Sequence, residues 1–203
     1  MGMKVLNLYA GIGGNRKLWA YVDVTAVEID RNIAKIYKDF FPDDRVVVAD
    51  AHQYLLDHYK EFDFIWTSRP CTSHTRARFW GLGNGKTKPL YPDFGLYEEI
   101  VFLNHHYKGK WVAENVIPYY KPLIPAQEIG RHLFWSNFYI PKYNTPNNMK
   151  TNKQSEWKEM LGFDISEYKN IGRRDKILRN CIIPELGLHI FNSMNNQELK
   201  LGI

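Results

Sequence analysis

Cys71 and Glu114 are the two residues of this chain whose side chains together suggest a reaction. Cys71 comes shortly after the apolar segment 62–66, and Glu114 directly follows the apolar segment 111–113. A thiolate can add to an electron-poor ring while a carboxylic acid stabilises the charge that develops on a ring nitrogen. The basic residues that follow Cys71 are expected to lower the pKa of its thiol. The alternative for Cys71 is a small buried apolar side chain, the usual environment of a free cysteine.

A glycine cluster, Gly11, Gly13 and Gly14, follows an apolar run at residues 4–9 and precedes a helix-like stretch that starts near Leu18. At a turn between a strand and a helix, the backbone can approach a nucleotide-type cofactor closely. The spacing is not the six-residue pyrophosphate fingerprint, which disfavours a nicotinamide or flavin dinucleotide. A tight turn without a ligand remains the alternative.

Two carboxylates end the next two strand-like segments. Glu28 lies near the end of segment 22–29 and could accept hydrogen bonds from ribose hydroxyls. Asp50 follows segment 45–48 and could meet an adenine amino group. Each carboxylate alone could be a solvated strand end, but their positions at successive strand ends favour an adenosyl cofactor.

The elements that must position these residues alternate between strand and helix patterns. Strand-like segments cover 4–9, 22–29, 45–48, 62–66, 110–113 and 133–140, and helical patterns cover 31–41, 51–59, 97–107 and a C-terminal stretch from about 184. This alternation predicts an α/β fold, a mostly parallel sheet with helices on both faces. Ligands of such sheets bind at the carboxyl ends of the strands, where the residues above are expected.

From residue 68 to about residue 93 the pattern breaks, and a long loop is predicted. It carries three glycines and the basic residues Arg76, Arg78, Lys86 and Lys88. Together with a net charge of +5 and a pI of about 9.0, this permits nucleic-acid binding without requiring it. The alternative is a solvated loop.

The composition restricts the class of protein. A chain of 203 residues is long enough for one well-buried α/β domain. No run of eighteen apolar residues occurs and the first residues lack a signal-peptide pattern, so no membrane span is expected. Two cysteines favour a reduced, cytoplasmic setting. His105 and His106 have no matching ligand set elsewhere, so we expect no metal site.

The ordered motifs resemble those of the cytosine-C5 DNA methyltransferases. Residues 9–14, Tyr-Ala-Gly-Ile-Gly-Gly, look like the Phe-x-Gly-x-Gly cofactor motif of that family. Glu28, Asp50, Pro70-Cys71 and the segment 114–116 fall in the family's order and approximate spacing. Residues 179–184 look like its late asparagine-centred motif. The compact layout is similar to phage-encoded members, and the resemblance spans nearly the whole chain.

The resemblance implies a Rossmann-like class I methyltransferase fold, S-adenosyl-L-methionine as cofactor and double-stranded DNA as partner. It implies that Cys71 attacks carbon 6 of a flipped-out cytosine while Glu114 binds ring nitrogen 3, and that carbon 5 takes the methyl group. A role in restriction–modification, a phage-related origin and a monomeric state are further expectations.

The residues that the resemblance implies fall into three groups. The catalytic candidates are Cys71, Glu114 and Arg131. The cofactor-binding candidates are Tyr9, Ala10, Gly11, Gly13, Gly14, Glu28, Ile29, Asp50, Ala51, Pro70 and Asn180. The DNA-binding candidates are Ser73, Arg76, Arg78, Lys86 and Lys88, in a loop expected to close over DNA and to contact phosphates.

The chain departs from the family at three places. The proline that usually precedes Pro70 is replaced by Arg69, which could depress the pKa of Cys71, bind a phosphate or carboxylate, or alter cofactor chemistry. The family's later arginine pair is incomplete, with Arg131 as its candidate. The large target-recognition domain is absent, which suggests a short or relaxed recognition sequence.

We therefore expect a catalytic and cofactor-binding unit at 1–141, a short recognition-like segment at 142–174, and a C-terminal segment at 175–203 that returns to the catalytic unit. Segment 142–174 could also be a plain surface loop. Two other functions stay open: a methyltransferase that acts on tRNA cytosine, as some relatives of the family do, and a catalytically altered or inactive relative. Amino-group methylation is disfavoured because the Asp/Asn-Pro-Pro-aromatic tetrad is replaced by Ser-Arg-Pro-Cys.

Overall fold

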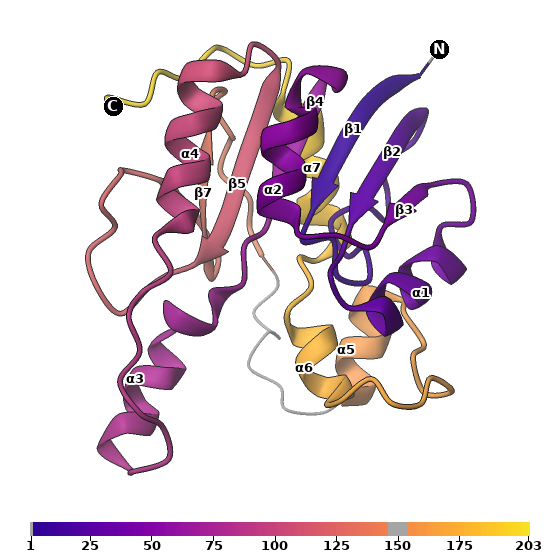
Figure 1. Cartoon of the computed structure of the whole chain (residues 1–203), viewed down its shortest axis with the longest axis vertical. Helices are drawn as coiled ribbons and strands as arrows, with labels where there is room; N and C mark the ends of the chain where they lie inside the picture. The colour runs from indigo at the N-terminus through magenta and orange to yellow at the C-terminus, as the bar shows by residue number, and fades with distance from the viewer. Residues whose placement is uncertain (1, 146–153) are drawn as a thin grey trace.

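A single seven-stranded sheet organises the protein, and the computed structural model describes residues 2–145 and 154–203. The strand order is β3-β2-β1-β4-β5-β7-β6 (Figure 1). Strands β1 to β5 pair in parallel, whereas β7 pairs antiparallel with both β5 and β6. The strands are β1 (Met3–Leu8), β2 (Val22–Val27), β3 (Arg45–Val47), β4 (Phe64–Thr67), β5 (Lys110–Val116), β6 (Gln127–Ile129) and β7 (His132–Ser136). The mostly parallel sheet confirms the predicted fold class.

Helices cover both faces of this sheet, as predicted. Helices α2 and α4 lie on one face and α7 lies on the other (Figure 1). The helices are α1 (Arg31–Phe40), α2 (Ala51–His58), α3 (Arg76–Gly83), α4 (Gly95–His106), α5 (Gln154–Leu161), α6 (Arg174–Arg179) and α7 (Pro184–Ser193). Two short 3-10 helices, η1 (Tyr59–Glu61) and η2 (Cys71–Ser73), flank β4.

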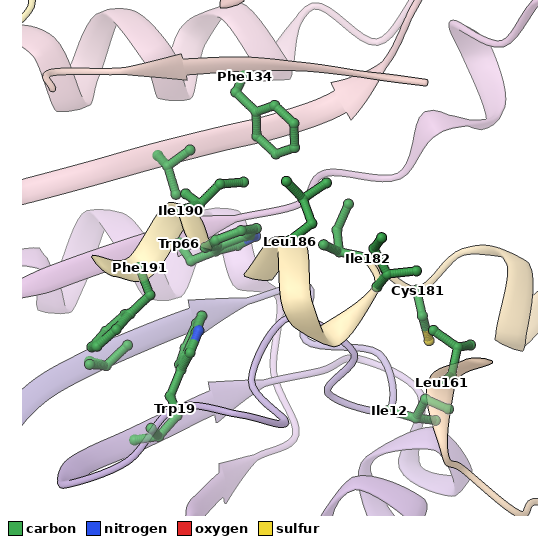
Figure 2. Close-up of a cluster of buried hydrophobic side chains, with 14 of the residues drawn as sticks. Ile12, Trp19, Trp66, Phe134, Leu161, Cys181, Ile182, Leu186, Ile190 and Phe191 are labelled. Carbon is green, nitrogen blue, oxygen red and sulfur yellow. The ribbon is translucent and has the colours of Figure 1, made fainter. Parts of the chain in front are cut away.

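The central strands are apolar on both sides, because each side is covered by helices. In β4, Phe64 and Trp66 point into the core beneath α7, and Ile65 points into the core beneath α2 and α4. Figure 2 shows the first of these cores, in which the ring of Trp19 stacks on Phe191 of α7 with centroids 5.0 Å apart. Burial of each such side chain contributes about 1.5–3 kcal/mol, which fixes the strands that carry the site.

The helix expected after the glycine cluster was a wrong prediction. Residues 9–21, all of them described, form consecutive turns between β1 and β2. The face of the sheet that such a helix would cover is already occupied by α7. A Cβ on Gly187 of α7 would lie 2.4 Å from the carbonyl oxygen of Asn15, so the turns and α7 pack backbone to backbone.

The long unstructured loop predicted for residues 68–93 was also wrong in part, because it contains η2 and α3. The Thr75 hydroxyl caps α3 by accepting a hydrogen bond from the amide of Ala77. The chain then folds back along the helix, and the amide of Lys86 donates to the carbonyl of Gly81 over 2.9 Å. The segment is therefore a helix followed by an irregular return segment that folds back along it, rather than an open loop.

The C-terminal half closes the sheet and completes the core. A two-residue turn at Gly130 and Arg131 joins β6 to β7, and Gly130 has φ 63°, a left-handed conformation that suits glycine. The predicted C-terminal helix is confirmed as α7, with Pro184 at its first position. Part of the expected recognition segment, 146–153, lies outside the described residues, and α5 within it contributes Trp157 and Leu161 to the core beneath α7.

Within the two described ranges, no helix has the length and apolar character needed to cross a membrane.

Candidate active site

The carboxyl ends of the five parallel strands bring the predicted site residues to one edge of the sheet. Gly11 and Gly13 lie in the turns after β1 with φ of 56° and 85°, and Tyr9 shares this left-handed conformation with φ 55°. The amide of Gly11 donates to Oε2 of Glu28 over 3.0 Å, which joins the glycine turn to the end of β2. The amide of Ala10 donates to the carbonyl of Val27. The glycine turn is thus held open against β2 by hydrogen bonds.

This edge fits an adenosyl cofactor. A Cβ placed on Gly11 would meet no described atom within 4 Å, so there is free space beside the backbone. Ile29, directly after Glu28, leaves 67% of its surface exposed, which offers an apolar contact for a flat ring. Asp50 is exposed after β3 and caps α2 by accepting a hydrogen bond from the amide of Gln53, and Ala51 is buried beneath it. The edge therefore offers carboxylates for hydroxyl and amino groups and an apolar surface for a base.

The segment after α6 packs against the same glycine turn. A Cβ on Gly14 would lie 2.7 Å from Cβ of Cys181 and 2.6 Å from the carbonyl oxygen of Ile182. Asn180, the predicted cofactor ligand, precedes these residues and is exposed at the end of α6. Gly14 is therefore required for close packing of this segment, and the late motif does return to the cofactor edge.

Cys71 opens the short helix η2 just beyond β4, preceded by the exposed Pro70. Burial raises the pKa of its thiol above the ordinary value, and the nearby carboxylate of Glu114 raises it further, while Lys176 and Arg131 lower it by smaller amounts. The expected depression of this pKa by the basic segment was therefore wrong. Most of that segment extends away along α3, so its charges do not act on the thiol.

Glu114 lies in β5 and is buried, with 8% of its surface exposed. Burial raises the pKa of its carboxyl group to about 7, against a smaller lowering by a hydrogen bond with Ser68 and by the charge of Arg131. Nε2 of His132 lies 3.7 Å from Oε1 of Glu114, and burial lowers the pKa of His132 to about 3, so this imidazole is neutral at pH 7. Near pH 7 the Glu114 carboxyl group can therefore hold or release a proton.

Arg131 lies in the turn between β6 and β7, and its charge acts on both Cys71 and Glu114. One guanidinium nitrogen, Nη2, donates to the carbonyl of Arg179, and the group lies 5.2 Å from the ring centroid of Trp157. Its buried Nε has no hydrogen-bond partner among the described residues. An unpaired buried donor is costly unless a ligand accepts its hydrogen bond. The structure thus brings the three predicted catalytic residues together.

Arg69 directs its guanidinium to protein partners other than the Cys71 thiol, whose pKa it was considered able to depress. Its Nε donates to Asp93 over 2.8 Å, and its Nη1 donates to the Tyr9 hydroxyl and to Glu99, each over 2.7 Å. A Cβ on Gly95 would lie 2.4 Å from the guanidinium carbon, so Arg69 occupies space that only a glycine leaves. These protein partners occupy the guanidinium, which argues against its use for a phosphate or a cofactor carboxylate.

Glu99 of α4 is the centre of this ion-pair cluster, and sequence reasoning missed it. It accepts hydrogen bonds from the hydroxyls of Tyr9 and Thr67 over 2.6 and 2.7 Å, and Oε1 lies 3.0 Å from Nδ1 of His52. The available signal was its position: residues 96, 99, 100 and 103 form the buried face of a helix, and a glutamate there requires partners.

The predicted DNA-binding residues divide into exposed and internal ones. Arg76, Lys86 and Lys88 are exposed, while the half-buried Arg78 donates from Nη2 to the carbonyl of Lys88 over 2.8 Å. Ser73 is buried, and its hydroxyl accepts a hydrogen bond from the amide of Asp93. Ser73 is thus used inside the protein, where it links η2 to the segment before α4, and its contact with DNA stays a prediction.

The fold and the cofactor edge are those of an S-adenosyl-L-methionine-dependent methyltransferase. Residues 3–117, more than half of the chain, match the family model described as C-5 cytosine-specific DNA methylase. The chain belongs to this family, whose methyl donor is S-adenosyl-L-methionine.

Solved structures with a similar fold include other methyltransferases. A DNMT2 variant from Spodoptera frugiperda shares 28% identity, with a TM-score of 0.41, over 56% of this chain and 35% of that chain. A putative DNA modification methyltransferase encoded within an E. coli prophage shares 21% identity, with a TM-score of 0.40, over 59% and 33% of the two chains. The chain thus spans about a third of the length of these two proteins. No curated protein sequence matches it.

Proposed function

We propose that this protein transfers a methyl group to carbon 5 of a cytosine in DNA through a covalent adduct of Cys71. The observation that supports this most is the cluster at the ends of β4 and β5, where a thiol, a carboxyl group with a pKa of about 7 and an arginine with an unpaired buried Nε act on one another. Such a set suits addition to a pyrimidine ring, which needs a nucleophile, a proton donor and a hydrogen-bond donor.

In the proposed mechanism, the Cys71 thiolate forms a bond to carbon 6 of a flipped-out cytosine. Glu114, in its protonated form, donates a hydrogen bond or a proton to ring nitrogen 3 and so stabilises the electrons displaced onto the ring. Arg131 would donate from Nε to the carbonyl oxygen on carbon 2 of the base. S-adenosyl-L-methionine, when bound, supplies the methyl group for carbon 5. Loss of the carbon 5 proton to a base from solvent, return of the ring nitrogen 3 proton to Glu114 and release of the thiolate then restore the ring.

The cofactor would be held by the residues of the sheet edge. The carboxylate of Glu28 would accept hydrogen bonds from the ribose hydroxyls, using the same oxygens that accept from the amides of Gly11 and Asp30. Asp50 would face the adenine base, and Ile29 would contact that base. The backbone of the glycine turn would form one wall of the cofactor site, at Tyr9, Ala10, Gly13 and Gly14. The exposed arginine of α3 and the exposed lysines of the return segment after it would contact phosphates.

The test is methyl transfer from labelled cofactor to unmethylated DNA, followed by digestion to nucleosides. We expect 5-methylcytosine, and trapping of the protein on DNA that contains 5-fluorocytosine. Cys71→Ala should abolish both while leaving cofactor affinity nearly unchanged, and Cys181→Ala is the matched control. Absence of modified cytosine from all DNA tested, with cofactor bound, would sink the proposal. Transfer to tRNA instead, at the same salt concentration, would change the substrate but keep the chemistry.

A further inference from the structure

The segment 75–92, which we name the α3 arm, projects from the carboxyl edge of the sheet (Figure 1). Within the described residues, α3 buries none of its side chains. The arm instead exposes four large apolar side chains: Phe79 at 55%, Trp80 at 68%, Leu90 at 51% and Tyr91 at 93%. Exposed apolar side chains gathered on one projecting element mark a binding surface more often than a stability feature.

Trp80 differs from every other tryptophan of the protein. The chain has six tryptophans, all in the described ranges, and the other five are at most 4% exposed. A large ring that is left in water loses the free energy that burial supplies. Its position at the surface of α3 therefore suggests that a partner covers it.

The charge of the α3 arm indicates the chemistry of that partner. Residues 72–92 contain Arg76, Arg78, Lys86 and Lys88 and not a single aspartate or glutamate. A positive surface with interspersed aromatic rings matches a polyanion that also has flat faces, which is a nucleic-acid strand with accessible bases. An apolar protein partner would not require the four positive charges.

Hydrogen bonds join the two halves of the α3 arm, so its aromatic rings lie on a surface that is already folded before a partner binds. The Thr87 hydroxyl donates to the carbonyl of Arg78 over 2.9 Å, and Arg78 donates in turn to the carbonyl of Lys88. A Cβ on Gly81 would lie 2.9 Å from the Thr87 side chain, which shows how closely the two halves approach. Preorganisation of this kind lowers the entropy lost on binding.

The base of the α3 arm connects this surface to the nucleophile. The ring of Phe79 stacks on Tyr119 with centroids 5.3 Å apart and planes at 12°, and Thr75 forms a bridge with Pro118. Cys71 lies in the 3-10 helix immediately before the arm. The arm therefore begins directly after the helix that carries the nucleophile, so DNA bound along the arm would lead toward Cys71.

We propose that Trp80 and Tyr91 stack on unpaired bases, so that the α3 arm binds single-stranded or locally opened DNA more tightly than closed duplex. This inference rests on the proposed function, because it names the form of DNA that the same site would accept. Stacking needs an accessible base face, which a closed duplex hides between its neighbours. The lysines would add phosphate contacts that do not distinguish the two forms.

Fluorescence anisotropy with a labelled 20-mer of thymidine and a labelled 20-base-pair duplex tests this in the cofactor-free protein. We expect tighter binding of the single strand by the wild type. Trp80→Ala and Tyr91→Ala should each weaken it about 5- to 150-fold without changing its salt dependence. Lys86→Gln with Lys88→Gln should weaken both probes and reduce the salt dependence. Tyr139→Ala is the matched control, because Tyr139 is 49% exposed and follows β7 at the opposite edge of the sheet.

Equal affinity for the two probes, no binding of either, or unchanged binding by Trp80→Ala would overturn the inference. A change from dimer to monomer on Trp80→Ala in sedimentation would also overturn it, by showing that a second copy covers the ring. Unchanged melting temperatures would show that the variants fold. Methyl transfer to DNA together with unchanged binding by Trp80→Ala would reject the inference alone, whereas ring-dependent binding without any methyl transfer would reject the proposed function alone.

Discussion

Glu99 and Glu114 are both buried at the carboxyl edge of the sheet, yet their surroundings differ. Glu99 has two hydroxyl donors, the Arg69 guanidinium and an imidazole within hydrogen-bond distance. Glu114 has a neutral imidazole at 3.7 Å, and Ser68 and the charge of Arg131 lower its pKa by less than burial raises it. A carboxylate with many donors fixes the elements that supply them, whereas a sparsely paired one is free to exchange a proton near pH 7.

The two arginines follow the same division. Arg69 uses its guanidinium on Tyr9, Asp93 and Glu99 and so joins the glycine turn, the loop after β4 and the start of α4. Arg131 keeps a buried Nε without a partner in the described part of the chain. The cluster of Arg69 and Glu99 therefore holds the site together, whereas the cluster of Arg131 and Glu114 leaves a hydrogen-bond donor for a substrate.

The largest effect is expected on removal of the Glu114 carboxyl group, which tests the difference between the two glutamates most directly. If the proposed function holds, Glu114→Gln should lower the rate of methyl transfer about 10²- to 10⁴-fold, because the variant cannot give a proton to the ring. Single-turnover transfer from labelled cofactor measures this. Glu128→Gln, at the exposed position of β6, is the control, and a Glu114→Gln rate close to wild type would contradict the assigned role.

Removal of the other glutamate should affect stability. Glu99→Ala is expected to lower the free energy of unfolding by about 3 kcal/mol or more, because it leaves a partly buried Arg69 and two hydroxyls without their acceptor. Urea unfolding measures the loss. Glu98→Ala, the exposed neighbour, should change stability by less than about 0.5 kcal/mol. Equal effects of the two substitutions would show that the cluster does not hold the fold.

The pH dependence of stability distinguishes the two glutamates more finely. Burial raises the pKa of Glu114 to about 7 from 4.5, so the folded state binds this proton more tightly than the unfolded state. The contribution to stability is full below pH 4.5 and is lost as the pH rises through 7. Glu114→Gln should therefore gain stability relative to wild type between pH 5 and pH 8, by up to roughly 3 kcal/mol. Urea unfolding of both proteins at pH 5 and pH 8 checks this. A difference in unfolding free energy that is the same at the two pH values would refute it.

The smallest expected effect is on the reactivity of Cys71. Its pKa is raised by burial and by Glu114, so Glu114→Gln should move the pH midpoint of Cys71 alkylation downward. Iodoacetamide labelling followed by mass spectrometry resolves the two cysteines. Cys181 is the internal control, since burial raises its pKa to about 12 and it should stay unlabelled in both proteins. An upward shift for Cys71 would contradict the assigned electrostatics.

Sequence patterns predicted six of the seven described strands and the helices α1, α2, α4 and α7, because apolar spacing reflects burial on each face of a sheet. They did not predict the short elements β6, α5 and α6. They failed at residues 9–21, where α7, more than 160 positions later, covers the face that a local helix would need. They also missed the helix α3, since its residues bury nothing and so leave no apolar periodicity. The direction of the Cys71 pKa shift was missed because burial, which the sequence does not show, outweighs nearby positive charges.

The sequence by itself determined which chemical groups gather at one edge, because parallel strands bring their carboxyl ends together whatever the details of packing. Cys71, Glu114, Glu28 and the glycine turn could therefore be assigned to one site. Only the tertiary structure decided the use of Arg69, because its partners lie 60, 30 and 24 positions away in the chain. A guanidinium bonds with whichever acceptors the fold brings within about 3 Å, and proximity along the chain does not reveal them.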